Sequence, residues 1–231
     1  MATARSPESS PIPPRSTFSN PPRRPEWTFS CAPPAPSTFV DLEQLASEPY
    51  TSFVYGNGAD ARKASLEMLE RGVGEFAPPF GRALENGDGE TIGIVAGPLS
   101  RTELARARLQ AAQVAGELGL LDAGLAARGR LARDTLLALT DDDQYLSRIA
   151  VHASARGRGA ARVLLESFLS AARARGGRRA VLEVSPMHAG AIGLYESFGF
   201  VTLCERRADD PASGRSLVYR HMALTLPERA Q

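Results

Sequence analysis

One stretch, residues 145–199, constrains the fold of this chain more than any other. Residues 145–152 contain the β-branched, apolar Ile149 and Val151 together with polar side chains and predict a β-strand. A glycine-rich turn, Arg156-Gly157-Arg158-Gly159, follows. The helix predicted next has apolar residues at helical spacing and stops at Gly176-Gly177. Residues 180–184 predict another strand, so the stretch indicates a mixed α/β fold.

The glycine-rich turn has the properties of an anion site. A helix N-terminus presents free backbone N–H groups and the positive end of the helix dipole. Gly157 and Gly159 let the backbone approach a phosphate closely, and Arg156 and Arg158 add positive charge. The turn therefore predicts a cradle for a diphosphate.

Two motifs in this stretch resemble the acetyl-CoA core of the GCN5-related N-acetyltransferase (GNAT) superfamily. The first runs from Arg156 to Ala161, and the second contains His188, Ala191, Leu194-Tyr195-Glu196 and Gly199-Phe200. His188 stands where the family usually carries Asn. The resemblance implies acetyl-CoA as the acyl donor. It assigns cofactor contacts to Ile149, Ala150, Val151, Arg156, Gly157, Arg158, Gly159, Ala160, Ala161, His188 and Ala191.

The resemblance also implies the fold and the chemistry. The fold would be α/β, a central, mostly antiparallel mixed sheet flanked by helices, with a V-shaped split between strands 145–152 and 180–184. The splayed strand would pair with the pantetheine arm as an added strand would, and its backbone N–H groups would stabilise the oxyanion.

Tyr195 is the candidate acid, because it occupies the family's Leu-Tyr-Glu position, where the hydroxyl faces the cofactor sulfur. The alternative is a tyrosine that only packs in the core. Glu183 is the candidate base. It precedes Tyr195 by twelve residues, as the base does in the similar ribosomal-protein alanine acetyltransferases. The alternative is that Glu183 is only a structural carboxylate and that His152 or a water chain is the base.

The chain divides into two parts. Residues 1–36 contain ten of the 17 prolines and few aliphatic side chains, which predicts a disordered tail. Residues 37–227 predict the acetyltransferase domain. Its first half should contain helices at 40–47 and 59–71 and a hairpin of strands 81–84 and 91–96 around the turn signal at 86–89.

Residues 98–143 form an insertion relative to a minimal acetyltransferase. Helical periodicity over 101–118 and 129–139 predicts two helices, which either cover the acceptor end of the site or are a surface elaboration. The triplet 141–143, three aspartates, predicts a solvated turn. Strands 200–206 and 216–226 should form an antiparallel hairpin around a turn at 208–214.

Composition narrows the function classes. A net charge of +1 argues against a dedicated nucleic-acid binder. Arg173, Arg175, Arg178 and Arg179 are then expected to complement a helix C-terminus. Two cysteines and three scattered histidines show no metal-ligand spacing. No apolar run is long enough to span a bilayer, and the N-terminus has no hydrophobic signal-peptide core, so a soluble, cytoplasmic protein without a membrane partner is expected. A monomer or a homodimer is expected.

The sequence therefore predicts an acetyl-CoA-dependent N-acetyltransferase acting on a primary amine. A small-molecule acceptor is favoured because the insertion would enclose the pocket. The alternatives are a protein N-terminal acetyltransferase, which modifies a protein N-terminus, and a non-catalytic CoA-binding regulatory module.

Overall fold

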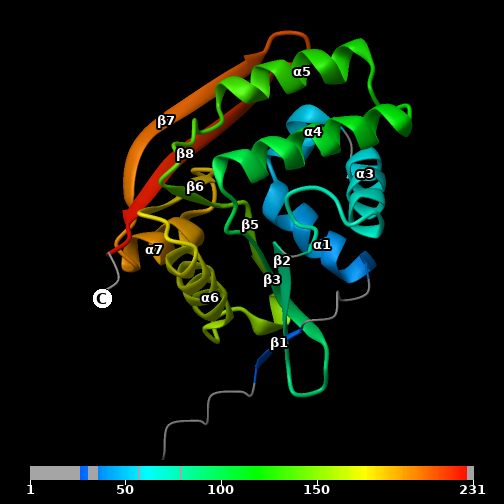
Figure 1. Cartoon of the computed structure of the whole chain (residues 1–231). Helices are drawn as coiled ribbons and strands as arrows, with labels where there is room; N and C mark the ends of the chain where they lie inside the picture. Colours follow the sequence, from blue (N-terminus) through cyan, green and yellow to red (C-terminus); the bar gives the residue numbers. More distant parts are fainter. Residues whose placement is uncertain (1–26, 31–35, 57, 79, 228–231) are drawn as a thin grey trace, which may run out of the picture.

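The computed structural model describes residues 27–30, 36–56, 58–78 and 80–227 (Figure 1). Its elements, in chain order, are β1 (Thr28–Ser30), α1 (Pro36–Ser47), α2 (Tyr50–Val54), α3 (Gly58–Glu70), β2 (Gly81–Glu85), β3 (Thr91–Ala96), α4 (Arg101–Glu117), α5 (Ala123–Asp134), β4 (Asp143–Leu146), β5 (Arg148–Val151), the 3-10 turn η1 (Ala153–Ala155), α6 (Ala160–Ala174), β6 (Arg179–Val184), α7 (Ala189–Ser197), β7 (Val201–Asp210) and β8 (Arg215–Thr225).

The described strands form two four-stranded sheets, in the orders β1-β2-β3-β5 and β4-β6-β8-β7. Only the β4–β6 pair is parallel among these described pairings, which confirms the mostly antiparallel mixed sheet. Helices α1, α3 and α4 lie on one side of Figure 1, and α6 and α7 lie on the other.

The predicted strand 145–152 is wrong as a single element, because it breaks at Ser147. The segment before the break, β4, pairs with β6 up to Leu146 opposite Leu182. The segment after it, β5, pairs with β3 in the other sheet. The N–H of Ser147 donates to the carbonyl of Ala96 at 2.9 Å, where Arg148 is also in register. Ser147 and Arg148 therefore both lie opposite Ala96, which is the pattern of a β-bulge. The chain passes from one sheet to the other at this bulge, and the predicted split opens there.

Helix α6 forms as its apolar periodicity predicts. Leu164, Leu165 and Phe168 are fully buried, and the helix packs against β3 and β5. The glycine stop is confirmed: Gly176 adopts a φ of +78°, and its N–H donates to the carbonyl of Arg173 at 3.0 Å. Burial of this face fixes where the glycine turn at its N-terminus lies.

The insertion contains two helices, but the second is displaced from its predicted position at 129–139. Helix α4 begins at a capping box formed by Ser100 and Glu103. Helix α5 begins at Asp122, whose carboxylate accepts the N–H of Leu125 at 2.6 Å. It ends at Asp134, and in the irregular segment that follows Leu137 and Leu139 pack against the core.

The aspartate triplet is not uniformly solvated, and that prediction is wrong for Asp143. This side chain is fully buried, and its carboxylate accepts hydrogen bonds from the Arg179 guanidinium at 2.6 and 3.0 Å. Burial would raise the pKa of Asp143, but hydrogen bonds from Arg179 and Thr140 reverse this and lower the pKa. The exposed Asp142 pairs with Arg178.

The predicted disordered tail is wrong for residues 27–30. Strand β1 pairs antiparallel with β2, with Phe29 opposite Leu84, and Trp27 and Phe29 pack against the core. Two aromatic side chains in a proline-rich segment are enough to cover the edge of β2. The rest of the predicted tail before α1 lies outside the described residues, apart from Pro36, the first residue of α1.

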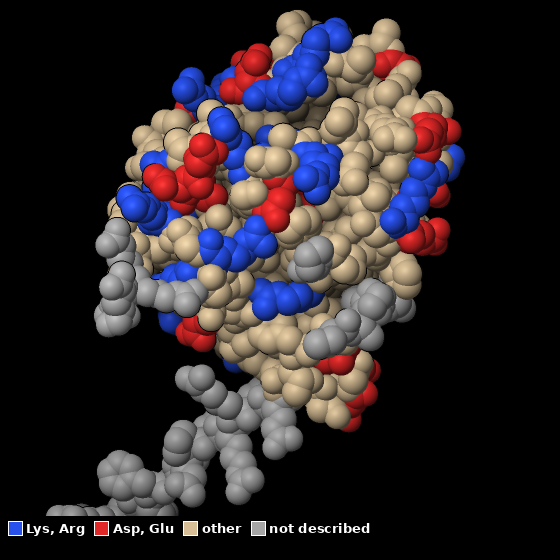
Figure 2. Space-filling model, viewed as in Figure 1, with Lys and Arg blue, Asp and Glu red and all other residues tan. Residues whose placement is uncertain are grey.

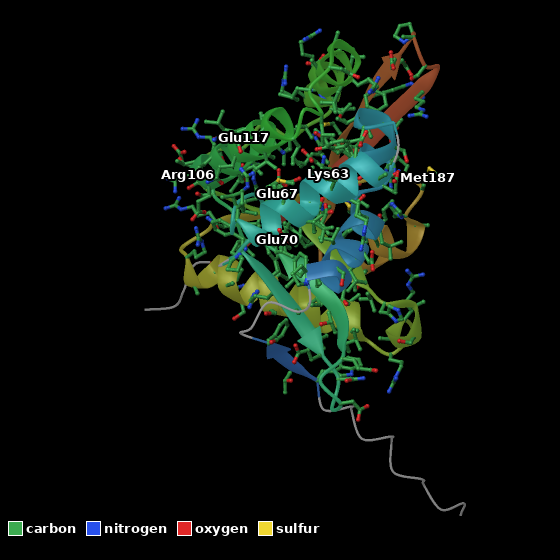
Figure 3. The ribbon with its side chains drawn as sticks, turned by 90° about the vertical axis from the view of Figure 1, so that its right-hand side faces the viewer. Lys63, Glu67, Glu70, Arg106, Glu117 and Met187 are labelled. Atoms are coloured by element: carbon green, nitrogen blue, oxygen red, sulfur yellow. The ribbon has the colours of Figure 1, made fainter. Side chains whose placement is uncertain are left out.

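The bounds of the remaining elements lie within a few residues of their predicted bounds. The exceptions are α2, which was not predicted, and the turn predicted at 208–214. The β7–β8 hairpin is antiparallel, as predicted. Strand β7 continues to Asp210, so the turn predicted at 208–214 is wrong for residues 208–210 and is confined to 211–214. Arg71, the residue after α3, pairs with Glu67 of α3 and Glu117 of α4 and so links the two helices. Figure 3 labels the two glutamates.

No helix in the described ranges is both long enough and apolar enough to cross a bilayer. Positive and negative side chains are interspersed over the face shown in Figure 2.

Candidate active site

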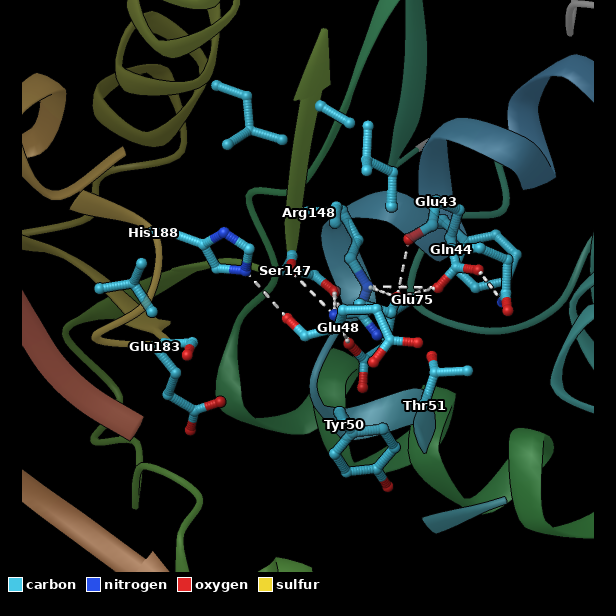
Figure 4. Close-up of a pocket in the computed structure, with 18 of the residues that line it drawn as sticks. Glu43, Gln44, Glu48, Tyr50, Thr51, Glu75, Ser147, Arg148, Glu183 and His188 are labelled. Carbon is cyan, nitrogen blue, oxygen red and sulfur yellow. Dashed lines mark hydrogen bonds and ion pairs between the residues drawn. The ribbon is translucent and has the colours of Figure 1, made fainter. Parts of the chain in front are cut away.

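A cavity of about 1320 Å³ follows the split between the two sheets. Its walls come from α1, α2, β5, β6 and α7, and from both helices of the insertion. It contains almost all of the residues predicted for the site (Figure 4 shows part of it). Segments far apart in the sequence therefore meet around one volume.

The glycine turn forms one wall of this cavity. Gly157 and Gly159 have φ angles of +71° and +91°, a region that favours glycine. A Cβ at either position would meet no atom within 4 Å, so the space over both glycines is open. Gly159 is the N-cap of α6 and provides no side-chain cap. The helix N-terminus therefore faces open space, as an anion site requires.

The predicted cradle residues are not equivalent in the structure. Arg156, Gly157, Gly159, Ala160 and Ala161 line the cavity, whereas the predicted Arg158 does not. Arg162, which the sequence analysis missed, does line it. The position of Arg162 in the first turn of α6, next to the predicted cradle, is the signal that could have identified it.

The second wall is the free edge of β5, which contains Ile149, Ala150 and Val151. The N–H of His152 donates to the carbonyl of Ile92 in β3 at 2.8 Å. Because hydrogen-bonding directions alternate along a strand, the N–H groups of Ile149 and Val151 point away from β3. They lie on the edge that β6 leaves unpaired, and so they are available to a ligand.

Tyr195 is buried and lines the cavity from α7. Its ring packs against Phe200, with centroids 5.7 Å apart. No described residue forms a hydrogen bond with its hydroxyl. Burial raises the pKa of Tyr195 well above its usual value, so the hydroxyl remains protonated at neutral pH.

Glu183 lines the cavity from β6, just beyond the point where β4 stops pairing. Its carboxylate accepts a hydrogen bond from the Tyr145 hydroxyl at 2.9 Å and another from the N–H of Leu137. Burial raises the pKa of Glu183, and attraction to Arg108 and the two hydrogen bonds oppose that rise only in part. A carboxyl with a raised pKa is suited to accept a proton near neutral pH.

Of the three remaining candidates, His188 and Ala191 lie in the cavity and His152 lies outside it. The His188 Nε2 lies 3.1 Å from the carbonyl oxygen of Glu48, so this contact joins the α7 side to the α1–α2 connection (Figure 4). His152, the alternative base, does not line the cavity; it is exposed, and its Nδ1 lies 2.8 Å from the Ser154 hydroxyl.

A buried ion-pair network in this cavity was missed by the sequence analysis. Arg148 lies between Glu43 and Glu75, at 3.3 and 3.7 Å, and also binds Ser47 at 2.8 Å (Figure 4). Glu75 pairs in turn with Arg108 at 3.3 Å. An arginine in the apolar pattern of strand 145–152 was the available signal.

The tyrosines were also missed as a group. All five tyrosines of the chain, Tyr50, Tyr55, Tyr145, Tyr195 and Tyr219, line this one cavity. They come from α2, the residue after it, β4, α7 and β8. Their positions in the sequence show no periodicity, so only the fold brings them together.

Within the described ranges, no group of three or more His, Cys, Asp or Glu side chains is placed to hold a metal ion. The described polar groups that line the cavity include carboxylates, guanidinium groups, phenols, hydroxyls, the carboxamide of Gln44 and the imidazole of His188.

Comparison with known proteins agrees with this arrangement. Residues 123–200 match the sequence model of the acetyltransferase (GNAT) family. No curated protein matches the chain by sequence. The resemblance to the GNAT superfamily is confirmed by the family match and the fold, and that family consists of acyltransferases that use acetyl-CoA.

Solved structures share the fold at low sequence identity. An acetyltransferase crystal structure has a TM-score of 0.56 and 21% identity, covering 83% of this chain and 95% of that one. An N-acetyltransferase from Staphylococcus aureus Mu50 has a TM-score of 0.57 and 18% identity, covering 82% and 94%. The ribosomal-protein-S18-alanine N-acetyltransferase from Escherichia coli has a TM-score of 0.51 and 21% identity, covering 89% and 97%. These likenesses establish the fold.

Proposed function

We propose that this protein is an acetyl-CoA-dependent N-acetyltransferase whose acceptor is the primary amine of a small molecule. One observation carries the proposal. A single cavity contains the glycine cradle, the unpaired edge of β5, a buried tyrosine hydroxyl and a buried carboxylate of raised pKa. Anion binding, thioester positioning, an acid and a base are the functions that acetyl transfer needs.

Acetyl-CoA supplies an activated acetyl thioester when bound. The cradle at Gly157 and Gly159 is open enough for a diphosphate, and Arg156 and Arg162 on its rim provide positive charge. The free edge of β5 accepts an extended amide-bearing arm as a neighbouring strand would. The chain thereby holds the thioester beside Tyr195.

The side chains have separate tasks. Glu183 removes a proton from the acceptor ammonium, because only the neutral amine has a lone pair. The N–H groups of Ile149 and Val151 donate to the carbonyl oxygen as negative charge develops there. Tyr195 gives its proton to the departing thiolate, and its raised pKa keeps that proton available until then.

The insertion supports a small acceptor. Helices α4 and α5 line the acceptor end with small side chains, among them Ala111, Ala115, Ala126 and Gly129. Small side chains leave room at this end of the cavity, while the two helices form part of its wall. A cavity with two helices at its acceptor end suits a small molecule better than a protein chain.

The test measures release of free thiol from acetyl-CoA with a panel of primary amines that includes a peptide with a free N-terminus. Tyr195→Phe should lower kcat ten- to a thousandfold and leave acetyl-CoA affinity unchanged, because the packed ring remains. Glu183→Gln should flatten the acidic limb of the pH–rate profile.

Glu196→Gln is the matched control for loss of a carboxylate, because Glu196 is exposed on α7 and does not line the cavity. Acetyl-CoA binding without thiol release for any amine would exclude the enzymatic function. Preference for the peptide over every small amine would exclude the proposed acceptor class.

A further inference from the structure

The acceptor half of the cavity has a distinctive composition. Its polar wall contains Tyr50, Tyr55, Tyr145 and Tyr219 together with Glu43, Glu75, Glu183, Arg108 and Arg148. We refer to these nine residues as the tyrosine chamber. Their charges and phenols influence one another directly, as the pKa shifts of Tyr50, Tyr145 and Tyr219 show.

Four of the five charged groups in the chamber neutralise one another. Arg148 pairs with Glu43 and Glu75, and Arg108 pairs with Glu75. Burial would raise the pKa of Glu75, but attraction to Arg108 and Arg148, together with hydrogen bonds from Ser147 and Arg108, lowers it. Two cations and two carboxylates therefore balance.

Glu183 is the group outside this balance. It forms no direct ion pair with a described residue. Burial raises its pKa, and the attraction of Arg108 and the hydrogen bonds from Tyr145 and Leu137 oppose that rise only in part. A buried carboxylate whose charge is only partly compensated is costly when ionised. One positive charge on a ligand would offset that cost, whereas a ligand carboxylate would increase it.

We propose that the chamber selects an acceptor with one ammonium group and an uncharged polar body, and that it rejects acceptors bearing a carboxylate. This specificity rests on the proposed N-acetyltransferase function. The ammonium lies against Glu183, and the body of the acceptor contacts the phenols. Amino acids with a free carboxylate are thereby excluded, and their decarboxylated or amidated counterparts are favoured.

The phenols provide the matching surface for such a body. Tyr50, Tyr55 and Tyr219 are half-buried, and no described residue forms a hydrogen bond with their hydroxyls. Burial raises the pKa of each, to about 12 for Tyr55, so all three hydroxyls remain neutral donors and acceptors. Their rings also attract a cation.

Other charges on the cavity wall do not reverse this selection. Arg130 and Arg133 line the cavity from α5, but both are exposed, so solvent and salt screen them. Glu48, which is half-buried on the same wall, adds negative charge. The buried balance therefore still favours a cation.

The experiment compares matched acceptors that differ in a carboxylate: tyramine, tyrosinamide and tyrosine, and histamine, histidinamide and histidine. Rates of thiol release give kcat/KM, and calorimetry on the CoA-loaded protein gives affinity without turnover. Both carboxylate-free members of each set should exceed the amino acid by at least tenfold in each measurement. Equal or better use of the amino acids would overturn the proposal.

The two readouts separate this inference from the proposed function. Binding of tyramine or histamine without thiol release would contradict the enzymatic function and support the chamber's selectivity. Absence of any preference in binding and in rate would contradict the selectivity, even in an active enzyme.

Two variants test the charge balance itself. Glu75→Gln leaves a positive charge uncompensated, so the preference against the carboxylate should fall at least tenfold, whereas Glu196→Gln should leave it unchanged. If Glu75→Gln does not fold, Glu183→Gln provides the test: the CoA-loaded variant should bind tyramine at least tenfold more weakly. Unchanged selectivity in Glu75→Gln, or unchanged tyramine affinity in Glu183→Gln, would overturn the proposal.

Discussion

The hydroxyl of Tyr145 donates a hydrogen bond to the carboxylate of Glu183 at 2.9 Å and so links the neighbouring parallel strands β4 and β6 at the cavity wall. This bond stabilises the ionised carboxylate and lowers the pKa of Glu183 against the effect of burial. The two residues therefore form one unit in which a phenol adjusts the strength of the candidate base.

Tyr145→Phe should raise the pKa of Glu183 further, because burial remains and the hydrogen bond is lost. The base is then protonated up to a higher pH, so the acidic limb of kcat/KM should move upward by about one pH unit. A hydrogen bond to a charged group contributes about 1.5–3 kcal/mol, and one pKa unit is about 1.4 kcal/mol. Tyr55→Phe is the control, because no described residue bonds to its hydroxyl. An acidic limb that stays in place in Tyr145→Phe would show that this bond does not tune the base.

Gly159→Val should raise the dissociation constant of acetyl-CoA at least tenfold, about 1.4 kcal/mol. A side chain at Gly159 occupies the open space over the cradle and strains a backbone with a φ of +91°. Gly176→Val is the matched control, because Gly176 has a φ of +78°, the same open surroundings and no place in the cavity. Calorimetry should show wild-type affinity for the control; equal losses in both variants would refute the cradle.

Arg179→Gln should lower the free energy of unfolding by about 1–2 kcal/mol. This is less than a fully buried hydrogen bond between charged groups contributes, because the Arg179 side chain is partly exposed. The pKa of Asp143 is lowered in the folded protein, so the ionised pair stabilises the fold above the unfolded value of about 3.9. As the pH falls through the folded-state pKa, that contribution disappears. Urea unfolding at pH 7 and at pH 3 measures it, with Arg178→Gln as the exposed control. A difference that persists undiminished at low pH would contradict the role of Asp143.

Phe29→Ala should lower the free energy of unfolding by about 1–3 kcal/mol, because its half-buried ring packs on the core and under the Arg82 guanidinium, 5.3 Å from the ring centroid. Thr28→Ala, at an exposed position of the same strand, is the control. Identical denaturation midpoints for wild type and Phe29→Ala would show that β1 contributes no stability.

Local patterns predicted the elements around the cradle well. The apolar face of α6, the glycine stop after it and the hairpin around 86–89 depend on neighbouring residues alone, so the sequence contains the information directly. The split between the sheets was predicted from the family resemblance, but its cause was not. A bulge at Ser147 depends on which strand lies on each side, and a single strand pattern does not contain that information.

Other errors have the same origin. Averaging composition over residues 1–36 concealed Trp27 and Phe29, whose burial depends on the distant edge of β2. The second inserted helix is an exception: periodicity placed it too late because the Asp122 cap, a local signal, was overlooked. The ion pairs of Arg148 and the gathering of all five tyrosines arise from long-range folding. Arg148 itself was a local signal, but its partners and the positions of the tyrosines could not be predicted locally.

The N–H of Leu137 that binds Glu183 comes from the segment after α5. Because it belongs to the backbone, an alanine scan across the insertion would change the Leu137 side chain and keep this donor. Such a scan would report that the insertion plays no part in setting the base. Replacement of the amide by an ester at this position, or by proline, removes the donor itself. Sequence drift in the insertion can therefore preserve its electrostatic contribution while every side chain changes.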